Sequence, residues 1–495
     1  MIKSKKSIII ILGVIAALTA ALAVSFMIPK DESITSSDNN EIILYYKQGL
    51  VPEYFSVKNA SGEYELLGFI FNDSQYTDAG SESSAENSHT MPDGTDVVYT
   101  MQDHYTYKLD KEITDQLVSQ AQSLSAKQII DKSGSRYGEF GLDEPKYSYS
   151  VRYSDAEEIK IDIGNYAPDN EGIYVKKNND ENVYLVDAAS IDSFFIEKLQ
   201  LFDKRITGTI DEVHSLSLSG RAYSEFINLV KNTFGCYPSK FITDDEKRDC
   251  CNDNASKMIC EDIQSLYGEK VAAIDVTKDD LAQFGLDKPY QKIVLLGKSS
   301  GSITLLTSAE DESGSFYVMA QNAKTVYTIS SKNAAWYSLT SAELLDSSVF
   351  KVVDSEVKQL KTTIGKEEKT ITIDRVKKTG PNYYENEFIT VKYGDKELLY
   401  TNISIFLNDL SKLERTNEAP ESLDDFKQTL LEVEFGYYNY PQLTDTVKIM
   451  RSSSGKTAAV VNGEIECFVS SEDADKIVSQ AKQITSSERI SSAFD

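Results

Sequence analysis

Two short stretches contain residue types that could do chemistry. Gly-Lys-Ser-Ser-Gly at 297–301 has the glycine spacing of a nucleophile elbow, which would make Ser299 a catalytic serine. Such a serine needs a histidine as its general base, and in chains with this elbow the histidine follows it. The last histidine here is His214, and the flanking "KIVLL" and "SITLL" read as two strands. We therefore predict a hairpin turn.

The second stretch, "SSGKTAAV" at 453–460, resembles a phosphate-binding loop, but Met450 stands where that loop needs its first glycine. A hairpin turn is again the prediction. His89, His104 and His214 are far apart in the sequence, and the cysteines lack the paired spacing of a zinc site. We therefore expect no metal, no cofactor and no catalytic residue, although a pair of acidic side chains is defined only by its spacing in three dimensions.

Cysteines are the remaining reactive side chains. Four of the five lie close together, at Cys236, Cys250, Cys251 and Cys260, and Cys467 stands alone. Disulfides are permitted outside the cytoplasm. On one helix Cys251 and Cys260 would be about 13 Å apart, too far for a disulfide. A bond from Cys236 to Cys250 or Cys251 is easier because a loop joins them, and the connectivity stays open.

Charge and targeting restrict the location. A formal net charge of −27 argues against a nucleic-acid partner, which needs clustered Lys and Arg. Lys3, Lys5 and Lys6 precede an uncharged apolar run, Ser7–Ile28, which is long enough as a helix to span about 30 Å of hydrocarbon. Lysines ahead of such a span keep the N-terminus in the cytoplasm. We predict one transmembrane helix in the cell membrane, with the bulk of the chain extracytoplasmic.

A cleaved signal peptide is the competing interpretation, because Ala21-Leu22-Ala23 resembles a peptidase site. The apolar run continues beyond that site through Ile28, which favours a retained anchor.

A repeated hexamer indicates how the elements are organised. "EFGLDEPKYSY" at 139–149 returns as "QFGLDKPYQKI" at 283–293, 144 residues later. The similarity continues downstream, where Tyr174 and Tyr317 correspond, and a degenerate third copy is expected near 400–480. Internal repetition predicts architecture before any motif does.

The hexamer suits a structural junction between a helix and a sheet. Phe and Leu dock in the core, Gly permits a tight backbone, Asp accepts backbone N–H bonds and Pro stops a helix. The residues concerned are Phe140, Gly141, Leu142, Asp143 and Pro145 in the first copy, and Phe284, Gly285, Leu286, Asp287 and Pro289 in the second. A ligand-binding role for the two aspartates is the alternative.

Each copy contains the same elements. A strand pair is followed by an amphipathic helix, with Asp110 as N-cap in copy one and Asn402 in front of the helix in copy three. The hexamer and alternating strands come next; Val151, Tyr153 and Ile159 share one parity. The predicted fold class is α+β: a transmembrane helix followed by tandem modules of antiparallel sheet plus helix.

The predicted boundaries follow from these repeats. They are a basic cytoplasmic segment at 1–6, the anchor at 7–28, a linker at 29–40, module 1 at 41–205 with a mobile acidic loop at 72–96, module 2 at 206–345 with a cysteine insert at 236–260, and module 3 at 346–490.

This plan resembles the domain of unknown function 4340 family, chiefly through "YGEFGLDEP" at 137–145 and "GIYVKK" with "NVYLVD" farther on. The resemblance is close over 100–205, good over 265–350 and weak over 351–490. It implies a membrane-anchored bacterial envelope protein that accompanies an ABC transporter permease or a gliding-motility-like export system. It transfers no catalytic residue. The acidic loop and the cysteine insert depart from the family pattern.

The expected function is thus a non-enzymatic extracytoplasmic scaffold or accessory protein. The alternatives are a solute- or glycan-binding protein with clefts between repeats, and an envelope hydrolase that uses scattered carboxylates.

Overall fold

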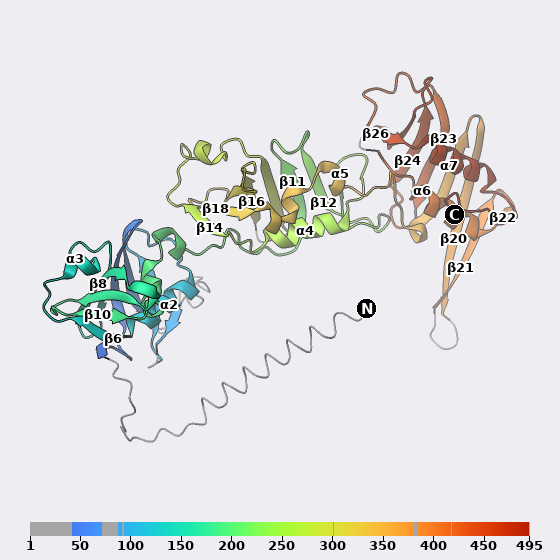
Figure 1. Ribbon diagram of the computed structural model, residues 1–495. Coiled ribbons are helices and arrows are strands. Elements are labelled where there is room, and N and C mark those ends of the chain that lie inside the picture. The colour runs from blue at the N-terminus through green and yellow to red at the C-terminus, as the bar shows by residue number, and fades with distance from the viewer. Residues whose placement is uncertain are drawn as a thin grey trace.

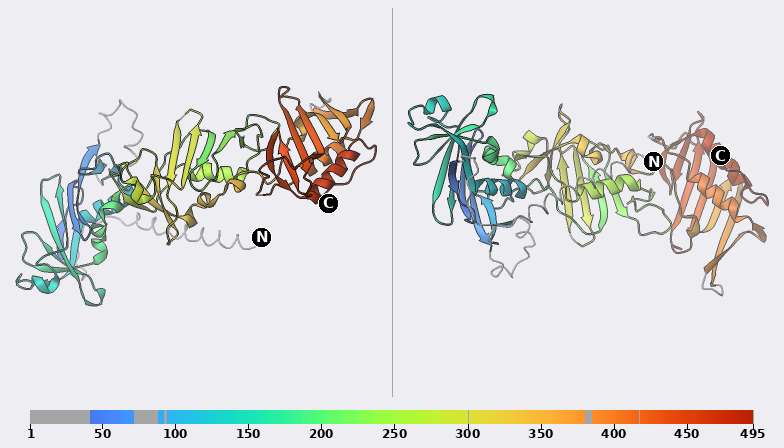
Figure 2. Two further views of the ribbon diagram at one scale, coloured as in Figure 1. Left: turned by 90° about the horizontal axis from the view of Figure 1, so that it is seen from above. Right: turned by 60° about the horizontal axis from the view of Figure 1, so that its bottom comes forward.

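The computed structural model describes residues 42–71, 88–91, 94–299, 301–379, 385–416 and 418–494. Within them the chain forms three antiparallel sheets of ten, eight and eight strands. The sheets lie in a row in chain order, coloured blue to teal, green to yellow and orange to red (Figure 1). The other two directions show the same elongated arrangement (Figure 2).

The strands of each sheet are consecutive in the sequence. Sheet 1 contains β1 (Ile42–Tyr46), β2 (Pro52–Asn59), β3 (Gly62–Phe71), β4 (Ser88–Thr90), β5 (Asp96–Met101), β6 (Ser123–Asp131), β7 (Tyr147–Tyr153), β8 (Glu158–Tyr166), β9 (Ile173–Lys177) and β10 (Val183–Val186). Sheet 2 contains β11 (Val213–Ser219), β12 (Ile227–Lys231), β13 (Phe241–Thr243), β14 (Lys270–Ala273), β15 (Gln291–Gly297), β16 (Ser302–Thr307), β17 (Ser315–Ala320) and β18 (Val326–Ser330). Sheet 3 contains β19 (Val357–Ile364), β20 (Glu367–Thr379), β21 (Glu385–Tyr393), β22 (Lys396–Leu398), β23 (Gln428–Tyr437), β24 (Thr444–Arg451), β25 (Thr457–Val461) and β26 (Glu464–Val469).

One seven-strand order recurs in all three sheets. It reads β5-β3-β2-β7-β8-β9-β10 in sheet 1, β13-β12-β11-β15-β16-β17-β18 in sheet 2 and β21-β20-β19-β23-β24-β25-β26 in sheet 3. The sheets differ only at their edges, where β4, β6 and β1 are added to the first, β14 to the second and β22 to the third. The three sheets are therefore copies of one supersecondary unit, and the third copy keeps the strand order although its sequence has diverged.

One helix follows the first strands of each unit: α2 (Lys111–Ala121), α4 (Asp253–Ile263) and α6 (Tyr400–Leu410). In α2 the side chain of Asp110 accepts hydrogen bonds from the amides of Glu112 and Ile113, as an N-cap does. Asn252 caps α4 in the same way. Sheet 3 is also covered by α7 (Ser471–Gln483), which contacts α6 as well as β19 and β23. The shorter helices are α3 (Tyr137–Phe140) and α5 (Ser341–Leu344), and one 3₁₀ turn spans Leu281–Phe284.

Alternation along the strands gives the predicted core. Val151, Tyr153, Ile159, Ile161 and Ile163 are all at most 1% exposed, so the predicted parity of β7 and β8 is confirmed. Side chains on one face of a strand repeat every second residue, which is why this pattern is readable from sequence.

The hexamer makes the same turn in both copies. Gly141 and Gly285 have φ of 73° and 68°, a left-handed conformation that L side chains rarely adopt, and each ends a single helical turn. The Phe140 ring meets Tyr174 edge-on at 4.8 Å between centroids, and Phe284 meets Tyr317 at 5.1 Å. The hexamer therefore links a helical turn to the sheet through two matching small clusters.

The length of the helix is corrected at this junction. The helix before the hexamer is only the short α3 or the 3₁₀ turn, because the strand β6 or β14 separates it from the amphipathic helix. Asp143 and Asp287 are exposed. Leu142 and Leu286 are buried, at 2% and 1% exposure, while Pro145 and Pro289 are half-buried at the start of the strands.

Other sequence-based details are corrected. Asn402 does not precede α6 but lies inside it, fully buried, where its amide bonds the backbone of Ser486, Glu488 and Ile490. Part of the predicted acidic loop is ordered: β4 pairs with β5, and His89 in it is buried. The predicted anchor at 7–28 lies outside the described residues, and no helix within them is long and apolar enough to cross a bilayer.

The close approach of the hexamer to β8 predicts a sensitive position. A Cβ on Gly164 would lie 2.1 Å from the backbone carbonyl oxygen of Phe140. We expect Gly164→Ala to lower the free energy of unfolding by about 2 kcal/mol or more, in the range of overpacked cores, in a urea titration. Gly436→Ala is the matched control, because its Cβ would meet only the Cβ of Gln359 at 3.5 Å. Equal losses for the two variants would contradict the assignment.

Candidate functional site: the two junctions between sheets

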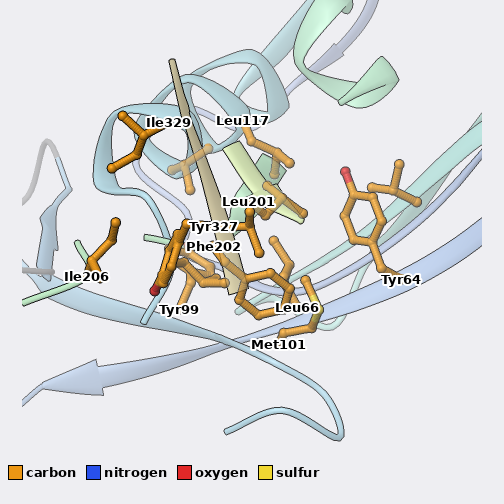
Figure 3. Close-up of a cluster of buried hydrophobic side chains, with 14 of the residues drawn as sticks. Tyr64, Leu66, Tyr99, Met101, Leu117, Leu201, Phe202, Ile206, Tyr327 and Ile329 are labelled. Carbon is orange, nitrogen blue, oxygen red and sulfur yellow. The ribbon is translucent and has the colours of Figure 1, made fainter. Parts of the chain in front are cut away.

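The first junction joins sheet 1 to sheet 2 through apolar side chains. One continuous buried cluster contains residues of both sheets, among them Tyr99, Met101 and Leu117 from the first and Tyr327 and Ile329 from the second. Figure 3 shows these side chains gathered around the connecting segment, which contributes Leu201, Phe202 and Ile206. The sheets therefore share one core, as expected for units that move together.

The connecting segment is tied to both sheets by its backbone. Leu201 O accepts from the Asp110 amide, and the Asp203 amide donates to Lys108 O, both on the side of sheet 1. On the side of sheet 2, the Ile206 amide donates to Leu266 O. Hydrogen bonds on both sides fix the direction of the segment, because a backbone group that is shielded from water costs free energy when it is left unpaired.

Polar side chains flank this first junction. Asp275, which follows β14, lies 3.1 Å from His104 Nδ1, and its Oδ1 accepts a hydrogen bond of 2.8 Å from the Tyr107 hydroxyl. The amide of Asp275 donates back to the Tyr107 oxygen at 3.0 Å. Lys198 Nζ and His104 Nε2 are 2.9 Å apart. No local sequence pattern indicates this group, because its members are up to 171 residues apart in the chain.

The second junction joins sheet 2 to sheet 3 and is built by the cysteine insert. Cys236, Tyr237, Ile242 and Cys250 belong to the core cluster of sheet 3 although they precede it by more than 100 residues. The amide of Val353 donates to Cys236 O at 2.8 Å. The predicted insert is therefore an inter-sheet connector, which explains why only the second copy contains it.

Asp445 is the centre of the second junction. Its carboxylate has no exposed surface and accepts four hydrogen bonds. The hydroxyls of Tyr237 and Tyr437 each donate to Oδ2 at 2.6 Å, while Arg248 Nη2 and Asn462 Nδ2 donate to Oδ1 at 2.7 and 2.9 Å. Burial, and then the Asp445 charge, raise the pKa of both tyrosines well above the usual value.

Two of those four donors, Tyr237 and Arg248, come from the insert of sheet 2, and the other two come from sheet 3. A buried charge is tolerated only when it is paired and hydrogen-bonded. Separating the sheets would strip half of the partners from Asp445, so this carboxylate opposes separation.

A second buried ion-pair group lies in the same junction. Arg415 Nη1 lies 2.5 Å from Glu466 Oε1, and Arg415 Nη2 lies 3.6 Å from Asp249 Oδ1. Lys247 Nζ lies 3.3 Å from Glu466 Oε2 and 3.9 Å from Asp249 Oδ2. Burial, and then the Glu466 charge, raise the pKa of the Asp249 carboxyl well above its usual value, against the opposing effect of Arg415 and Lys247.

The disulfides that the sequence allowed are not formed. All five cysteines are free thiols and buried. Cys236 and Cys250 face the core of sheet 3, whereas Cys251 and Cys260 belong to the core shared by sheets 1 and 2. Cys250 and Cys251 are consecutive extended residues, so their side chains point to opposite sides. Burial raises the pKa of Cys236, Cys260 and Cys467 to about 12, which keeps these thiols protonated and unreactive.

The motifs that resembled catalytic sites are turns. Ser299 lies between β15 and β16, and its amide donates to Asp211 Oδ2 at 2.8 Å. Residues 453–460 contain the turn between β24 and β25. Both hairpin predictions are confirmed.

Asp115, His89 and Thr114 form a hydrogen-bonded series of the kind found in catalytic triads, although His89 has no candidate partner in the sequence analysis. Its Nδ1 bonds Asp115, and its Nε2 lies 3.1 Å from Thr114 Oγ1. However, Thr114 is 1% exposed and its hydroxyl donates to the backbone of Asp110 at 2.8 Å. Burial lowers the pKa of His89. The group thus links β4 to α2 and offers substrate no accessible hydroxyl. Within the described residues, no group of three or more His, Cys, Asp or Glu side chains is placed to hold a metal ion.

Comparison with known protein families matches residues 99–221 and 251–427 to the family described as Domain of unknown function (DUF4340). These two segments make up more than half of the chain, so the protein belongs to this family. Searches of curated proteins and of solved structures give no match. The gap between the two matched segments, 222–250, contains most of the insert that builds the second junction.

The four-donor arrangement predicts the effect of losing one donor. We expect Tyr237→Phe and Tyr437→Phe each to lower the free energy of unfolding by about 2 kcal/mol, the value of a hydrogen bond to a buried charge. Of these two tyrosines, only Tyr237 reaches Asp445 across the junction, so only Tyr237→Phe should also speed hydrogen exchange at the Val353 amide. Unchanged exchange at that amide would show that Tyr237 does not hold the sheets together.

The raised pKa of Asp249 predicts a pH dependence. The folded chain holds this proton more tightly than the unfolded chain, so the contribution of Asp249 to stability falls as pH rises from about 4 towards neutrality. Asp249→Asn has the same shape and no charge. We expect it to exceed the wild type in unfolding free energy at pH 8 by at least about 1 kcal/mol, and to converge with it below pH about 4.

Urea titrations across this pH range measure the difference, with Asp279→Asn as an exposed control. A difference between Asp249→Asn and wild type that stays constant from pH 4 to pH 8 would contradict the raised pKa.

Proposed function

We propose that this protein is a non-enzymatic scaffold outside the cell membrane, held by one N-terminal span. It would act as an accessory part of a membrane transport complex such as an ABC transporter or a gliding-motility-like export system. The observation that carries this proposal is the pair of buried junctions, which hold three copies of one unit in a fixed row.

Rigidity supports a scaffold role because a spacer must keep its shape to position a partner. Flexible linkers between independent domains allow relative motion unless the interface is large and apolar. Here the first junction shares one apolar core, and the second buries Asp445 and Asp249 among partners from both sheets. A row of fixed units gives a partner a long, defined surface, as in other repeat proteins.

Membrane placement rests on the sequence. The basic residues before the apolar run at 7–28 favour a cytoplasmic N-terminus with the three sheets on the other side. Membership of the family, together with the transport association implied by the resemblance, suggests a membrane permease as the partner.

Co-purification tests the proposal. Tagged full-length chain at native expression, solubilised in mild detergent, should recover membrane permease subunits identified by mass spectrometry. Asp445→Ala should recover clearly fewer of them, because it removes the centre of the second junction and frees sheet 3. Gly436→Ala should recover them like wild type. Repeated failure of the wild-type chain to recover any permease subunit would overturn the proposal.

A solute-binding role is the second candidate, because one observation favours it. A cavity lies beside the second copy of the hexamer, and Leu286 and Asp287 of that hexamer line it.

A further inference from the structure

An open cavity lies in sheet 2, beside the second hexamer. It encloses about 760 Å³, within the usual range for small-molecule sites. Its apolar lining is aliphatic and includes Val276, Leu286, Leu306 and Met319. Val276, Leu286 and Met319 are at most 7% exposed, so they form a firm wall.

The equivalent place in sheet 1 is occupied by the protein itself. Tyr137 stands where sheet 2 has Leu281, 144 residues later, and its hydroxyl donates to Glu181 O at 2.9 Å. The Lys176 ammonium lies 4.3 Å from the centre of the Tyr137 ring. Sheet 2 has Met319 at the position of Lys176. The tyrosine that closes the gap in sheet 1 is thus replaced by a shorter side chain in sheet 2.

Strand register supports this alignment. Ser148 pairs with Asp162 in sheet 1, and Lys292 pairs with Leu306 in sheet 2. Each member of the second pair follows its counterpart by 144 residues. At this pair, a serine and an acid in sheet 1 are replaced by a lysine and a leucine in sheet 2.

The side chains around the cavity are also more basic in sheet 2 than at the equivalent place in sheet 1. Lys278, Lys292 and Lys324 line it, and none of them forms an ion pair with another described residue. Lys324 stands where sheet 1 has Glu181. Of the two lining aspartates, Asp275 is engaged by His104 and Tyr107 in the first junction. The three lysines outnumber the two lining aspartates, Asp275 and Asp287, although the whole chain has a net charge of −27.

We propose that this cavity binds a small anionic amphiphile, a molecule with a carboxylate or phosphate head and a short aliphatic chain. The aliphatic chain of the ligand would lie against Val276, Leu286 and Met319, where the burial of each CH₂ group removes apolar surface from water. The head would lie among the lysines, as charge complementarity requires. This binding is independent of the scaffold role and belongs to sheet 2 alone.

Octanoate is the probe, and the methyl carbon of Met319 is the local reporter. The full-length chain, ¹³C-labelled at its methionine methyl groups and held in phosphatidylcholine nanodiscs, is titrated and followed by NMR. We expect a saturable shift of the Met319 signal with octanoate and with octyl phosphate. Acetate lacks the aliphatic chain and octyltrimethylammonium reverses the charge, so neither should give a saturable shift.

Variants copied from sheet 1 make the test specific. Leu281→Tyr should fill the cavity and abolish the saturable shift. Lys324→Glu, an exposed change, should weaken binding about tenfold, because it replaces attraction by repulsion. Lys270→Glu, an exposed lysine of β14 outside the lining, should bind like wild type.

Several outcomes would overturn the proposal. They are an unshifted Met319 signal in wild type, equal affinity for octyltrimethylammonium, and an unchanged affinity in Lys324→Glu. If Leu281→Tyr does not fold, Lys324→Glu and Lys270→Glu still decide the result, because both change exposed side chains.

Discussion

The relative position of sheets 2 and 3 depends above all on one interaction, the hydrogen-bonded Asp445 carboxylate buried where the two sheets meet. Asp445 has no exposed surface, and its charge is balanced by donors drawn equally from both sides. Burying such a charge costs several kcal/mol unless every partner is in place. The second and third sheets therefore have one favourable relative position, because sliding or rotation would remove donors from the carboxylate before any new ones were found. An apolar interface of the same size would tolerate small shifts.

The two junctions thus solve the same problem with different chemistry. Between sheets 1 and 2, Phe202 and its neighbours merge two cores into one, and only the edge is polar. Between sheets 2 and 3, the core is crossed by charged groups contributed by an insert that the other units lack. Apolar contact supplies most of the association energy, and buried polar groups specify position. The buried polar groups occur at the junction where a segment, the cysteine insert, has been added to the repeated unit.

Much of the fold could be predicted because it depends on local patterns. The alternation from Val151 to Ile163 gave the buried faces, and Asp110 gave the start of α2. The repeated hexamer predicted that sheets 1 and 2 are copies. By contrast, Asn402 was misplaced because an amide can cap a helix or be buried inside one, and the choice depends on residues 84 to 88 positions away. The strand at His89 has no apolar periodicity, so its sequence predicts a loop.

The junctions themselves could not be predicted. Tyr237 and Asp445 are 208 residues apart, and nothing in either local sequence indicates the other. The cysteine cluster marks the insert that forms the second junction, although the sequence suggests disulfides there. The four thiols instead pack into two separate cores. Tyr137 and Leu281 are an intermediate case, since the repeat aligns them but only coordinates show that one fills space that the other leaves open.

The wide sequence separation within the second junction also sets an order of events for a chain that emerges from its N-terminus. Sheet 1 and its shared core with sheet 2 can assemble while later residues are still being made. The insert cannot reach its final place until residues as late as Glu466 have arrived. During that interval Cys236 and Cys250 lack the neighbours that later cover them. Folding of the last sheet is then also the step that seals two thiols from oxidants.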